Sequence, residues 1–495
     1  MSSLSDKAGF LIVANFIKYA VGFVMPMVLV RLLNQADYGT YQQMQLVNTI
    51  VSGILTLGLP TSVYYFFHHV KPHQHAALRS QTTWMLIASG CLAGLGVAWA
   101  AGLIGSRMNN ATLVGLLPLY ALSIAFLIAS EQFTPFMISQ DRYRVAVSFE
   151  TGETIVRVLI LIVPLSLGYG LKGLVLAAVM YAALRFVLRT VILFKSGGAT
   201  DPAQAGAGQS FVKEQLAYST PLALMSIVGL VGGQLDRGLV AAYFTPVDYA
   251  IYSVGALEIP LDVIFQASVA NVLRASLPPL IRDGRMQEVT RLMRESVRKL
   301  AIIVLPSFIF LYGHSQEFIT LLFTSRYEQS VSVFRIYLFL IPLHMFVLSM
   351  IPQIFGKTKT NLYIVITTAT IHLMLSFVLL KVVGFYGPAI SGVVSSYIAS
   401  LIFFMVAKRL IGATLSEMLP WLSLAKVVAA ALAGLVAARA LGAVTASGLM
   451  NLTLGGVLYS VVFFAVGAVI GLFTEGDWAL ARRWLGKVVP QRVRG

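Results

Sequence analysis

RLLNQADYGTYQQ, residues 31–43, and AYFTPVDYAIYSV, residues 242–254, are two copies of one short pattern that decides the fold. Each copy holds an Asp-Tyr pair, a small residue and a second tyrosine, and the offset from Asp37 to Asp248 is 211 residues. A second pair of stretches, YGLKGLVLAAVMY from Tyr169 and YGPAISGVVSSYI from Tyr386, repeats at an offset of 217 residues. Similarity at a nearly constant offset indicates an internal repeat, so the sequence predicts two equivalent halves.

The composition is that of a membrane protein. Of the 495 residues 58% are hydrophobic and only 11% are charged, whereas soluble domains carry about 25% charged residues. A membrane-spanning helix needs about 20 mostly apolar residues, and the chain contains about fourteen such stretches. They lie near residues 9–32, 42–67, 83–104, 113–137, 146–167, 173–194, 217–243, 250–273, 299–323, 331–352, 362–383, 386–407, 420–441 and 449–473. We therefore predict an all-α polytopic protein, with its ninth span irregular at the outer end.

The predicted spans divide into two lobes of six helices and two C-terminal helices. Because six is an even number, both lobes insert in the same orientation and form parallel repeats. The predicted organisation is an N-lobe at 1–196, a linker at 197–216, a C-lobe at 217–412, and spans thirteen and fourteen with a basic tail at 413–495. The linker is rich in Gly, Ala and Pro, which is typical of a flexible cytoplasmic connection.

The distribution of Lys and Arg predicts the orientation of the chain. Only six of the 36 basic residues fall in predicted outer loops, whereas short cytoplasmic loops normally carry the excess. Those six are Arg31, Arg107, Lys172, Arg326, Lys381 and Arg439. Both termini are thus expected in the cytoplasm. This asymmetry explains most of the net charge of +16, so nucleic-acid binding is not needed to account for it.

Two segments have the pattern of amphipathic surface helices that bind membrane lipids. Residues 286–297 alternate apolar residues with arginines at helical spacing, and the tail does the same with Trp478 and Trp484. The single cysteine, Cys91, excludes disulfides and cysteine-based metal clusters within the chain. No metal site is expected.

Charged residues inside the predicted spans are the functional candidates, because such groups cost several kcal/mol in a bilayer unless they are paired or face water. In the first half they are Lys18, Glu131, Glu150, Glu153, Arg157, Arg185 and Arg189. Glu153 and Arg157 have the acid-first spacing of an ion pair on one helix. Arg185 and Arg189 share a face and repel each other, so a neighbouring acid or a bound anion must offset them. We predict a water-filled cavity; the alternative is a structural clamp with snorkelling arginines.

The second half also carries buried charges. They are Asp236, Arg237, Glu258, Asp262, Arg335, His344, His372 and Lys426. Glu258 and Asp262 are one helical turn apart, and two acids on one helical face without an adjacent base resemble a site for H⁺ or Na⁺ coupling. The alternative is that Asp262 is paired with Arg237 or Arg335 and has only a structural role.

Enzymatic arrangements are missing from the sequence. There is no phosphate-binding glycine loop, no pair of carboxylates on a large outer loop, and no long outer segment that could organise glycosyl transfer. We expect no catalytic residues and no resident cofactor. The pattern favours movement of a substrate over chemistry on it.

The chain resembles bacterial polysaccharide (Wzx-type) flippases of the multidrug/oligosaccharidyl-lipid/polysaccharide exporter (MOP) superfamily. The resemblance lies in RLLNQADYGTYQ, in GQLDRGLVAAYFTPVDYAIYSVGALEIP, and in LGYGLKGLV and VGFYGPAISGVV. It implies two lobes that alternate between inward and outward states in the bacterial inner membrane. The implied substrate is an undecaprenyl-diphosphate-linked oligosaccharide, an O-antigen or exopolysaccharide unit, carried to the periplasmic leaflet. A polysaccharide polymerase and a chain-length regulator are the implied partners.

A diphosphate needs cations to leave the headgroup layer, and the planar guanidinium of arginine suits phosphate oxygens. Our hypothesis is therefore that Lys18, Arg157, Arg185 and Arg189 receive the diphosphate. Glu150, Glu153, Asp236, Arg237, Glu258 and Asp262 would be charge partners or couple transport to H⁺ or Na⁺. The alternatives are a peptidoglycan-precursor flippase, a cation or drug antiporter of the multidrug branch and, from a different class, a polysaccharide polymerase or ligase.

Overall fold

The computed structural model describes residues 4–196, 210–442 and 448–479, and among these the side chains of all but residues 4–16 and 260–263. The described residues are almost entirely helical and include no strand. A helix, continuous or interrupted, covers each of the fourteen stretches predicted to span the bilayer. Nine helical stretches of the described residues are long and apolar enough to cross a membrane, and three of them, 35–69, 111–139 and 358–411, each contain two successive α-helices. The predicted all-α polytopic fold is confirmed.

The chain forms two compact units, Met1–Val254 with His372–Ser391, and Gly255–Ile371 with Gly392–Gly495. These limits differ from those of the predicted lobes, which stay a prediction. The helices of the first unit are α1 (Leu4–Leu32), α2 (Gln35–Leu55), α3 (Leu59–His69), α4 (His75–Trp99), α5 (Ala101–Arg107), α6 (Ala111–Ala129), α7 (Phe133–Ser139), α8 (Tyr143–Ser166), α9 (Gly170–Lys195), α10 (Val212–Tyr243) and most of α11 (Pro246–Gly255). The first unit also includes the C-terminal part of α17 (Thr358–Val383).

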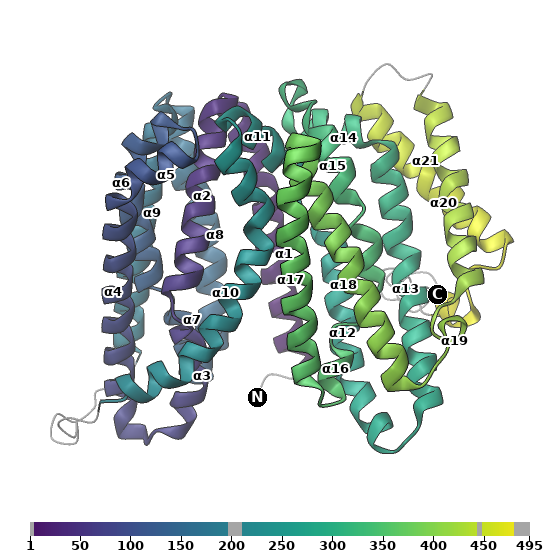
Figure 1. The fold of residues 1–495 in the computed structure, drawn as a ribbon, viewed down its shortest axis with the longest axis horizontal. Helices are drawn as coiled ribbons and strands as arrows, with labels where there is room; N and C mark the ends of the chain where they lie inside the picture. Colours follow the sequence, from purple (N-terminus) through teal and green to yellow (C-terminus); the bar gives the residue numbers. More distant parts are fainter. Residues whose placement is uncertain (1–3, 197–209, 443–447, 480–495) are drawn as a thin grey trace, which may run out of the picture. The chain divides into compact units, whose positions relative to one another are not determined.

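Within the first unit, α4 packs on α6 and α6 packs on α9, and these three helices run side by side (Figure 1). Helix α8 packs on both α1 and α9. The shorter helices α3 and α7 contact each other. Helix α8 thus lies next to the two helices that carry Lys18, Arg185 and Arg189.

Two predicted spans are broken rather than continuous. The second is divided into α2 and α3 at Thr56–Gly58, where Leu57 and Gly58 have positive φ angles of 51° and 67°. A Cβ at Gly58 would lie 3.0 Å from the carbonyl oxygen of Ser219 on α10, so glycine also permits close packing there. The fourth span is divided into α6 and α7 at residues 130–132. Glu131 lies in this second break.

The duplicated pattern forms a capped helix start in both copies. In the first copy the Asn34 side chain accepts a hydrogen bond from the Asp37 backbone N–H at 2.8 Å and donates to the Asp37 carboxylate at 2.8 Å. In the second copy Thr245 takes the place of Asn34 and bonds reciprocally with Asp248. The cap is thus the residue three positions before the aspartate. In the second copy Asp248 also accepts a hydrogen bond from the Thr245 backbone N–H, which completes a capping box.

The two copies pack against each other. A Cβ at Gly39 would lie 1.8 Å from the carbonyl oxygen of Pro246 and 3.3 Å from the Cβ of Ala250, so only glycine fits this contact. The four tyrosines of the two copies are all buried in the first unit. They are Tyr38, Tyr41, Tyr249 and Tyr252. The pattern is therefore a packing element.

The second unit is built around α13 (Met286–Gly313), which packs on α12 (Pro260–Arg282) and α20 (Trp421–Gly442). Its other helices are α14 (Ser315–Phe323), α15 (Ser330–Leu338), α16 (Ile351–Ile354), most of α18 (Gly387–Ile411), α19 (Leu415–Met418) and α21 (Gly448–Val469), with the first part of α17. Short 3₁₀ helices lie at Ser325–Tyr327 and Ile341–Met345.

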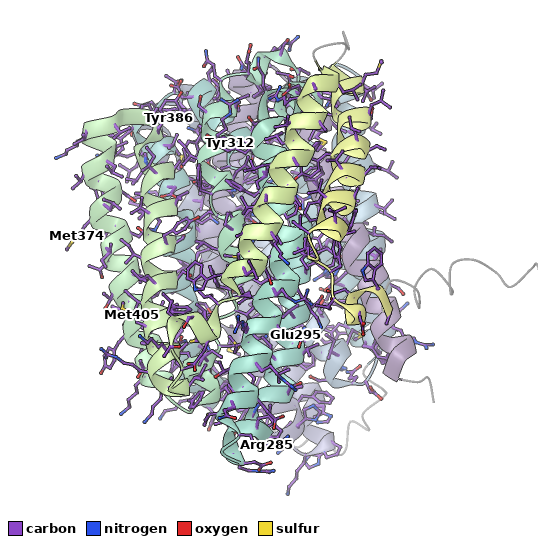
Figure 2. All side chains as sticks on the ribbon, turned by 90° about the vertical axis from the view of Figure 1, so that its right-hand side faces the viewer. Arg285, Glu295, Tyr312, Met374, Tyr386 and Met405 are labelled. Carbon is purple, nitrogen blue, oxygen red and sulfur yellow. The ribbon has the colours of Figure 1, made fainter. Side chains whose placement is uncertain are left out.

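Residues 286–297 do not form a separate surface helix, which corrects that prediction. They are the first turns of α13, which continues from Arg285 past Glu295 to Tyr312 (Figure 2). The apolar side chains of Val289 and Met293 are buried in the core of the second unit, because α12 covers this face. The helix breaks at His314, within the segment predicted to be irregular.

An ion pair attaches the segment after α21 to α13. Arg298 donates two hydrogen bonds to the Asp477 carboxylate, at 2.8 and 3.0 Å. Partial burial alone would raise the pKa of Asp477, but hydrogen bonds from Arg298 and Thr474 outweigh it and lower that pKa to about 2. Trp484 and the rest of the predicted amphipathic tail lie outside the described residues.

Candidate substrate-binding cavity

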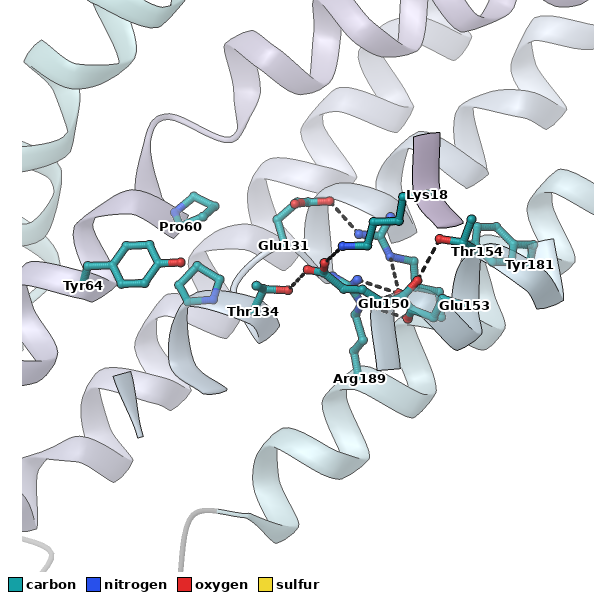
Figure 3. A pocket seen from close by; sticks show the side chains of 12 residues that line it. Lys18, Pro60, Tyr64, Glu131, Thr134, Glu150, Glu153, Thr154, Tyr181 and Arg189 are labelled. Carbon is teal, nitrogen blue, oxygen red and sulfur yellow. Dashed lines mark hydrogen bonds and ion pairs between the residues drawn. The ribbon is translucent and has the colours of Figure 1, made fainter. Parts of the chain in front are cut away.

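A polar cavity of about 440 Å³ lies inside the first unit (Figure 3). Its lining side chains come from α1, α3, α7, α8 and α9 and from the break between α6 and α7. They are Lys18, Pro60, Tyr64, Glu131, Thr134, Pro135, Glu150, Glu153, Thr154, Tyr181, Arg185 and Arg189. The structure therefore brings together six of the seven charged candidates of the first half, and five of the six had a role in the predicted site.

Arg189 has a full set of partners. Its guanidinium donates to Glu153 through Nε at 2.9 Å and through Nη2 at 2.6 Å, and its Nη1 lies 3.4 Å from the carbonyl oxygen of Ser130. The guanidinium carbon also lies 5.3 Å from the centre of the Phe133 ring. Only 5% of the Arg189 side chain and 10% of the Glu153 side chain are exposed. This buried bidentate pair joins α8 to α9.

Arg185, one turn earlier on α9, is only partly satisfied. Its Nη2 lies 2.9 Å from the Glu131 carboxylate, and its Nε is 3.8 Å from Glu153, too far for a hydrogen bond. That Nε is buried and has no hydrogen-bond partner among the described residues. Glu131 is 40% exposed. Arg185 thus retains donor capacity towards the cavity, and its one good partner is accessible.

Lys18 reaches the cavity from α1 and pairs with Glu150 on α8 (Figure 3). The same carboxylate accepts a hydrogen bond from the hydroxyl of Thr134 on α7. Lys18 is 31% exposed, so part of its ammonium group faces open space. The cavity therefore contains three cations and three carboxylates in mutual contact.

The spacing of these residues explains why they meet. Arg185 and Arg189 are four apart on α9 and Glu150 and Glu153 are three apart on α8, so each pair projects from one helical face. Helices α8 and α9 pack together, which brings the two faces into contact. The sequence required a neighbouring acid to offset the two arginines, and the structure supplies Glu153 and Glu131.

Arg157 does not line this cavity. Its side chain is exposed and lies beside the phenol groups of Tyr41, Tyr120 and Tyr181. The expected pair between Glu153 and Arg157 is not formed, because the Glu153 carboxylate turns to Arg189. Spacing along one helix predicted that Glu153 pairs with Arg157. At the buried contact between α8 and α9, Glu153 instead pairs with Arg189, which binds it through two nitrogens.

The remaining candidates are not gathered at the cavity. Asp236 on α10 lies 2.8 Å from the Nε2 atom of His372 on α17, within the first unit, and Arg237 follows it on α10. In the second unit, Arg335 donates to the hydroxyl of Ser315 at 2.7 Å, and Lys426 donates to the carbonyl oxygen of Gly471 at 3.1 Å. No group of three or more metal-ligating side chains occurs in the part of the chain that the structure describes.

Glu258 and Asp262 do not lie one turn apart on a single helix, which corrects that prediction. Helix α11 ends at Gly255 and α12 begins at Pro260, so Glu258 lies in an unwound segment. The residue before a proline is disfavoured in helical conformation, and proline suits the first turn of a helix. Glu258 is exposed, and the side chain of Asp262 lies outside the described residues.

An apolar pocket of about 260 Å³ adjoins the polar cavity between α8 and α9. It is lined by Phe149, Gly152, Val156, Leu184 and Leu188, with Ser148. Glu153, Tyr181 and Arg185 line both spaces. A charged region and an apolar region thus meet at Arg185.

Seven of the twelve lining residues had no role in the predicted site, and Glu131, Thr134 and Tyr64 are three of them. The sequence shows Glu131 as a charge within an apolar stretch, but it does not show that the helix is interrupted at this residue. Thr134 and Tyr64 gave no such signal, because hydroxyl groups and tyrosines are common in membrane helices.

A profile of the polysaccharide biosynthesis protein family matches residues 28–332, which is more than half of the chain. The chain belongs to this family. Among curated proteins none matches by sequence.

Solved structures of MOP transporters share the fold of this chain. The lipid II flippase MurJ in an inward closed conformation superposes with a TM-score of 0.71 at 13% identity, covering 93% of this chain and 98% of its own. An inward-facing multidrug transporter of the MATE family superposes with a TM-score of 0.62 at 12% identity. The match covers 80% of this chain and 94% of the transporter. A MOP transporter from Pyrococcus furiosus superposes with a TM-score of 0.51 at 12% identity, and the match covers 82% of this chain and 94% of that transporter. It is described as having a binding pocket of reversed polarity. The predicted MOP fold is confirmed, and the chain is a multi-pass membrane protein.

Proposed function

We propose that this protein is a flippase for an undecaprenyl-diphosphate-linked oligosaccharide. It carries the substrate from the cytoplasmic to the periplasmic leaflet of the bacterial inner membrane, with both termini in the cytoplasm. Membership of a polysaccharide biosynthesis family and the MOP transporter fold support this proposal. In this proposal, the lobes at 1–196 and 217–412 move so that the cavity opens in turn to the cytoplasm and to the periplasm. Transport is coupled to an ion that binds at Glu258 or Asp262. The product would pass to a polysaccharide polymerase and its chain-length regulator.

The observation that carries the proposal is the incomplete set of partners around Arg185. A phosphate oxygen that replaces the exposed Glu131 carboxylate would gain the Nη2 donor and would also reach the unused Nε. Bidentate contact with phosphate is the geometry in which arginine is strongest. The ammonium group of Lys18 adds a second cation from α1.

The adjoining apolar pocket fits an amphiphilic substrate. A lipid-linked diphosphate has an anionic head and an apolar chain, and here the spaces for both share Arg185 and Tyr181. A water-soluble anion needs only the polar space. The pairing of the two spaces therefore favours a lipid-linked substrate.

The same contacts argue against an exporter of organic cations. All three carboxylates of the cavity are already paired with Lys18, Arg185 or Arg189. A cationic ligand would have to displace the buried guanidinium of Arg189, which is far more costly than displacing an exposed carboxylate. The lipid II flippase MurJ shares only the fold at 13% identity, so a peptidoglycan precursor is a competing substrate to be tested.

Reconstituted vesicles provide the test. Transport of a fluorescent prenyl-diphosphate-oligosaccharide is expected in wild type and is expected to fall about thirtyfold in Arg185→Ala, because a charge-assisted hydrogen bond is worth about 2 kcal/mol. Arg282→Ala is the matched control, since Arg282 is 79% exposed in the second unit and remote from the cavity residues in sequence.

Three outcomes would contradict the proposal. The first is equal transport by wild type and Arg185→Ala at equal membrane abundance. The second is transport of an organic cation and not of the lipid-linked sugar. The third is transport of a peptidoglycan precursor in preference to other lipid-linked oligosaccharides, which would assign the alternative substrate.

A further inference from the structure

Four consecutive aromatic residues, Tyr64 to Phe67, lie on α3, whose face towards the cavity carries Tyr64. The helix begins after the break at Gly58, and Pro60 lies in its first turn. Since successive residues of a helix point in directions about 100° apart, the four rings face different surroundings. Their partners therefore reveal how α3 is fixed.

Three of the four rings are held by neighbouring rings. Tyr65 is stacked between His69, at 3.8 Å between ring centres, and Tyr218 of α10, at 4.5 Å. Phe66 is buried and meets Tyr218 edge to face. Phe67 stacks on His75 at 4.0 Å. These contacts fix the rotation of α3.

Tyr64 is the exception. It is 41% exposed and has no ring contact or hydrogen bond among the described residues. Its ring points along the cavity towards Thr134 and Glu131, and Pro60 lies beside it (Figure 3). The locked neighbours prevent it from turning into the core. An unpartnered aromatic face is thus presented to the same cavity as Lys18 and Arg185.

The cavity has more room than a diphosphate uses. Its volume of about 440 Å³ lies in the range of pockets that hold whole organic ligands. One end carries the cations, and the other carries the rings of Tyr64 and Pro60. A pyranose ring has an apolar C–H face that suits such rings and hydroxyl groups that suit nearby carboxylates.

We propose that Tyr64 and Pro60 form a subsite for the first sugar of the substrate, the one bonded to the diphosphate. This inference rests on the proposed function, because the diphosphate at Arg185 and Lys18 fixes the sugar against Tyr64. The subsite recognises a sugar ring through its C–H face, and its selectivity resides in the aromatic face rather than in charge.

Equilibrium binding to the full-length protein in nanodiscs tests the subsite. The two probes are a short-chain prenyl diphosphate and the same molecule bearing one hexose. Tyr64→Leu is expected to weaken binding of the hexose probe about fivefold and to leave the sugar-free probe unchanged, as expected for the loss of one aromatic contact. Tyr64→Phe keeps the ring and is expected to bind both probes like wild type. Tyr363→Leu, at a tyrosine of α17 that is 66% exposed, is the matched control.

The outcomes separate this inference from the proposed function. Equal weakening of both probes by Tyr64→Leu, or no weakening of either, overturns the sugar subsite. If Arg185→Ala still abolishes binding of both probes in that case, the proposed function stands. Failure of wild type to bind either probe overturns the proposed function and the subsite together. Melting temperatures of the variants within about 2 °C of wild type verify that the fold is retained.

Discussion

Arg189 and Arg185 lie one helical turn apart on α9, at two ends of the polar cavity, and they differ in how completely their guanidinium groups are hydrogen-bonded. At the Arg189 end, a bidentate pair with Glu153, a carbonyl contact and an aromatic ring satisfy a guanidinium that is 5% exposed. At the Arg185 end, one carboxylate that is 40% exposed holds a guanidinium whose buried Nε has no hydrogen bond.

The difference teaches that charge within a span is not by itself a sign of function. A buried and fully paired arginine fixes two helices, because removing either partner leaves an isolated charge. A partly satisfied arginine with an accessible partner can exchange that partner for a ligand. We therefore assign Arg189 a positioning role within our proposal and leave anion binding to Arg185 and Lys18.

The largest expected effect comes from removing the Arg189 guanidinium. Arg189→Ala leaves the Glu153 carboxylate buried without its partner, which is expected to destabilise the protein by about 4 kcal/mol. Membrane abundance and the melting temperature in detergent measure this loss. The double variant Arg189→Met with Glu153→Gln is expected to recover most of the stability. An Arg189→Ala protein that was stable but unable to bind the head group would reverse the two assignments.

The second effect is a gain of binding at the Arg185 end. Glu131→Gln removes the charge that competes for Arg185, so a prenyl diphosphate is expected to bind about tenfold more tightly. Isothermal titration in nanodiscs measures the dissociation constant. Glu153→Gln serves as the contrasting variant, because it is expected to lower the melting temperature instead. Weaker binding by Glu131→Gln would show that Glu131 assists the ligand and does not compete with it.

A smaller effect is expected in the apolar pocket beside Arg185. No atom lies within 4 Å of a Cβ built at Gly152, so Gly152→Leu fits and occupies part of that space. Binding of a lipid-linked diphosphate is expected to weaken about fourfold, the effect of one displaced methylene group. A water-soluble nucleotide sugar serves as the comparison ligand and should show no change. Gly115→Leu, at another open glycine, is the control. Equal loss for both ligands would place the lipid chain elsewhere.

The smallest effect concerns an ion pair outside the cavity, Arg298 with Asp477. Because the pKa of Asp477 is lowered to about 2, its stabilising effect is present above the ordinary carboxyl pKa of about 4 and is lost as the pH falls through about 2. Asp477→Asn is therefore expected to lower the melting temperature by about 2 °C at every pH from 5 to 8. A pH-dependent difference between the two proteins across that range would contradict this assignment.

Much of the fold was predictable because bilayer thickness fixes the length of each apolar stretch. The repeat was also visible, since the copies at Asp37 and Asp248 keep their spacing. The breaks in the helices were not predicted, except near His314. Residues 56–58 are Thr-Leu-Gly and residues 130–132 are Ser-Glu-Gln, and neither triplet contains a proline that would predict the end of a helix.

The candidate site was predictable as a set of charges but not as a set of pairs. Spacing on one helix linked Glu153 to Arg157, whereas packing between α8 and α9 selected Arg189. Which partner a carboxylate takes depends on the distance between helices, and that distance is not encoded in local periodicity. Tyr64 could not be selected either, because its importance depends on the neighbours that hold Tyr65, Phe66 and Phe67.

The contact between Gly39 and Pro246 has a consequence for the duplicated halves. Gly39 and Ala250 occupy equivalent positions in the two copies, and they face each other across this contact. An alanine at position 39, like the one at position 250, would place its Cβ 1.8 Å from the carbonyl oxygen of Pro246. The two copies of the pattern therefore cannot carry the same residue at this position if they are to pack as they do.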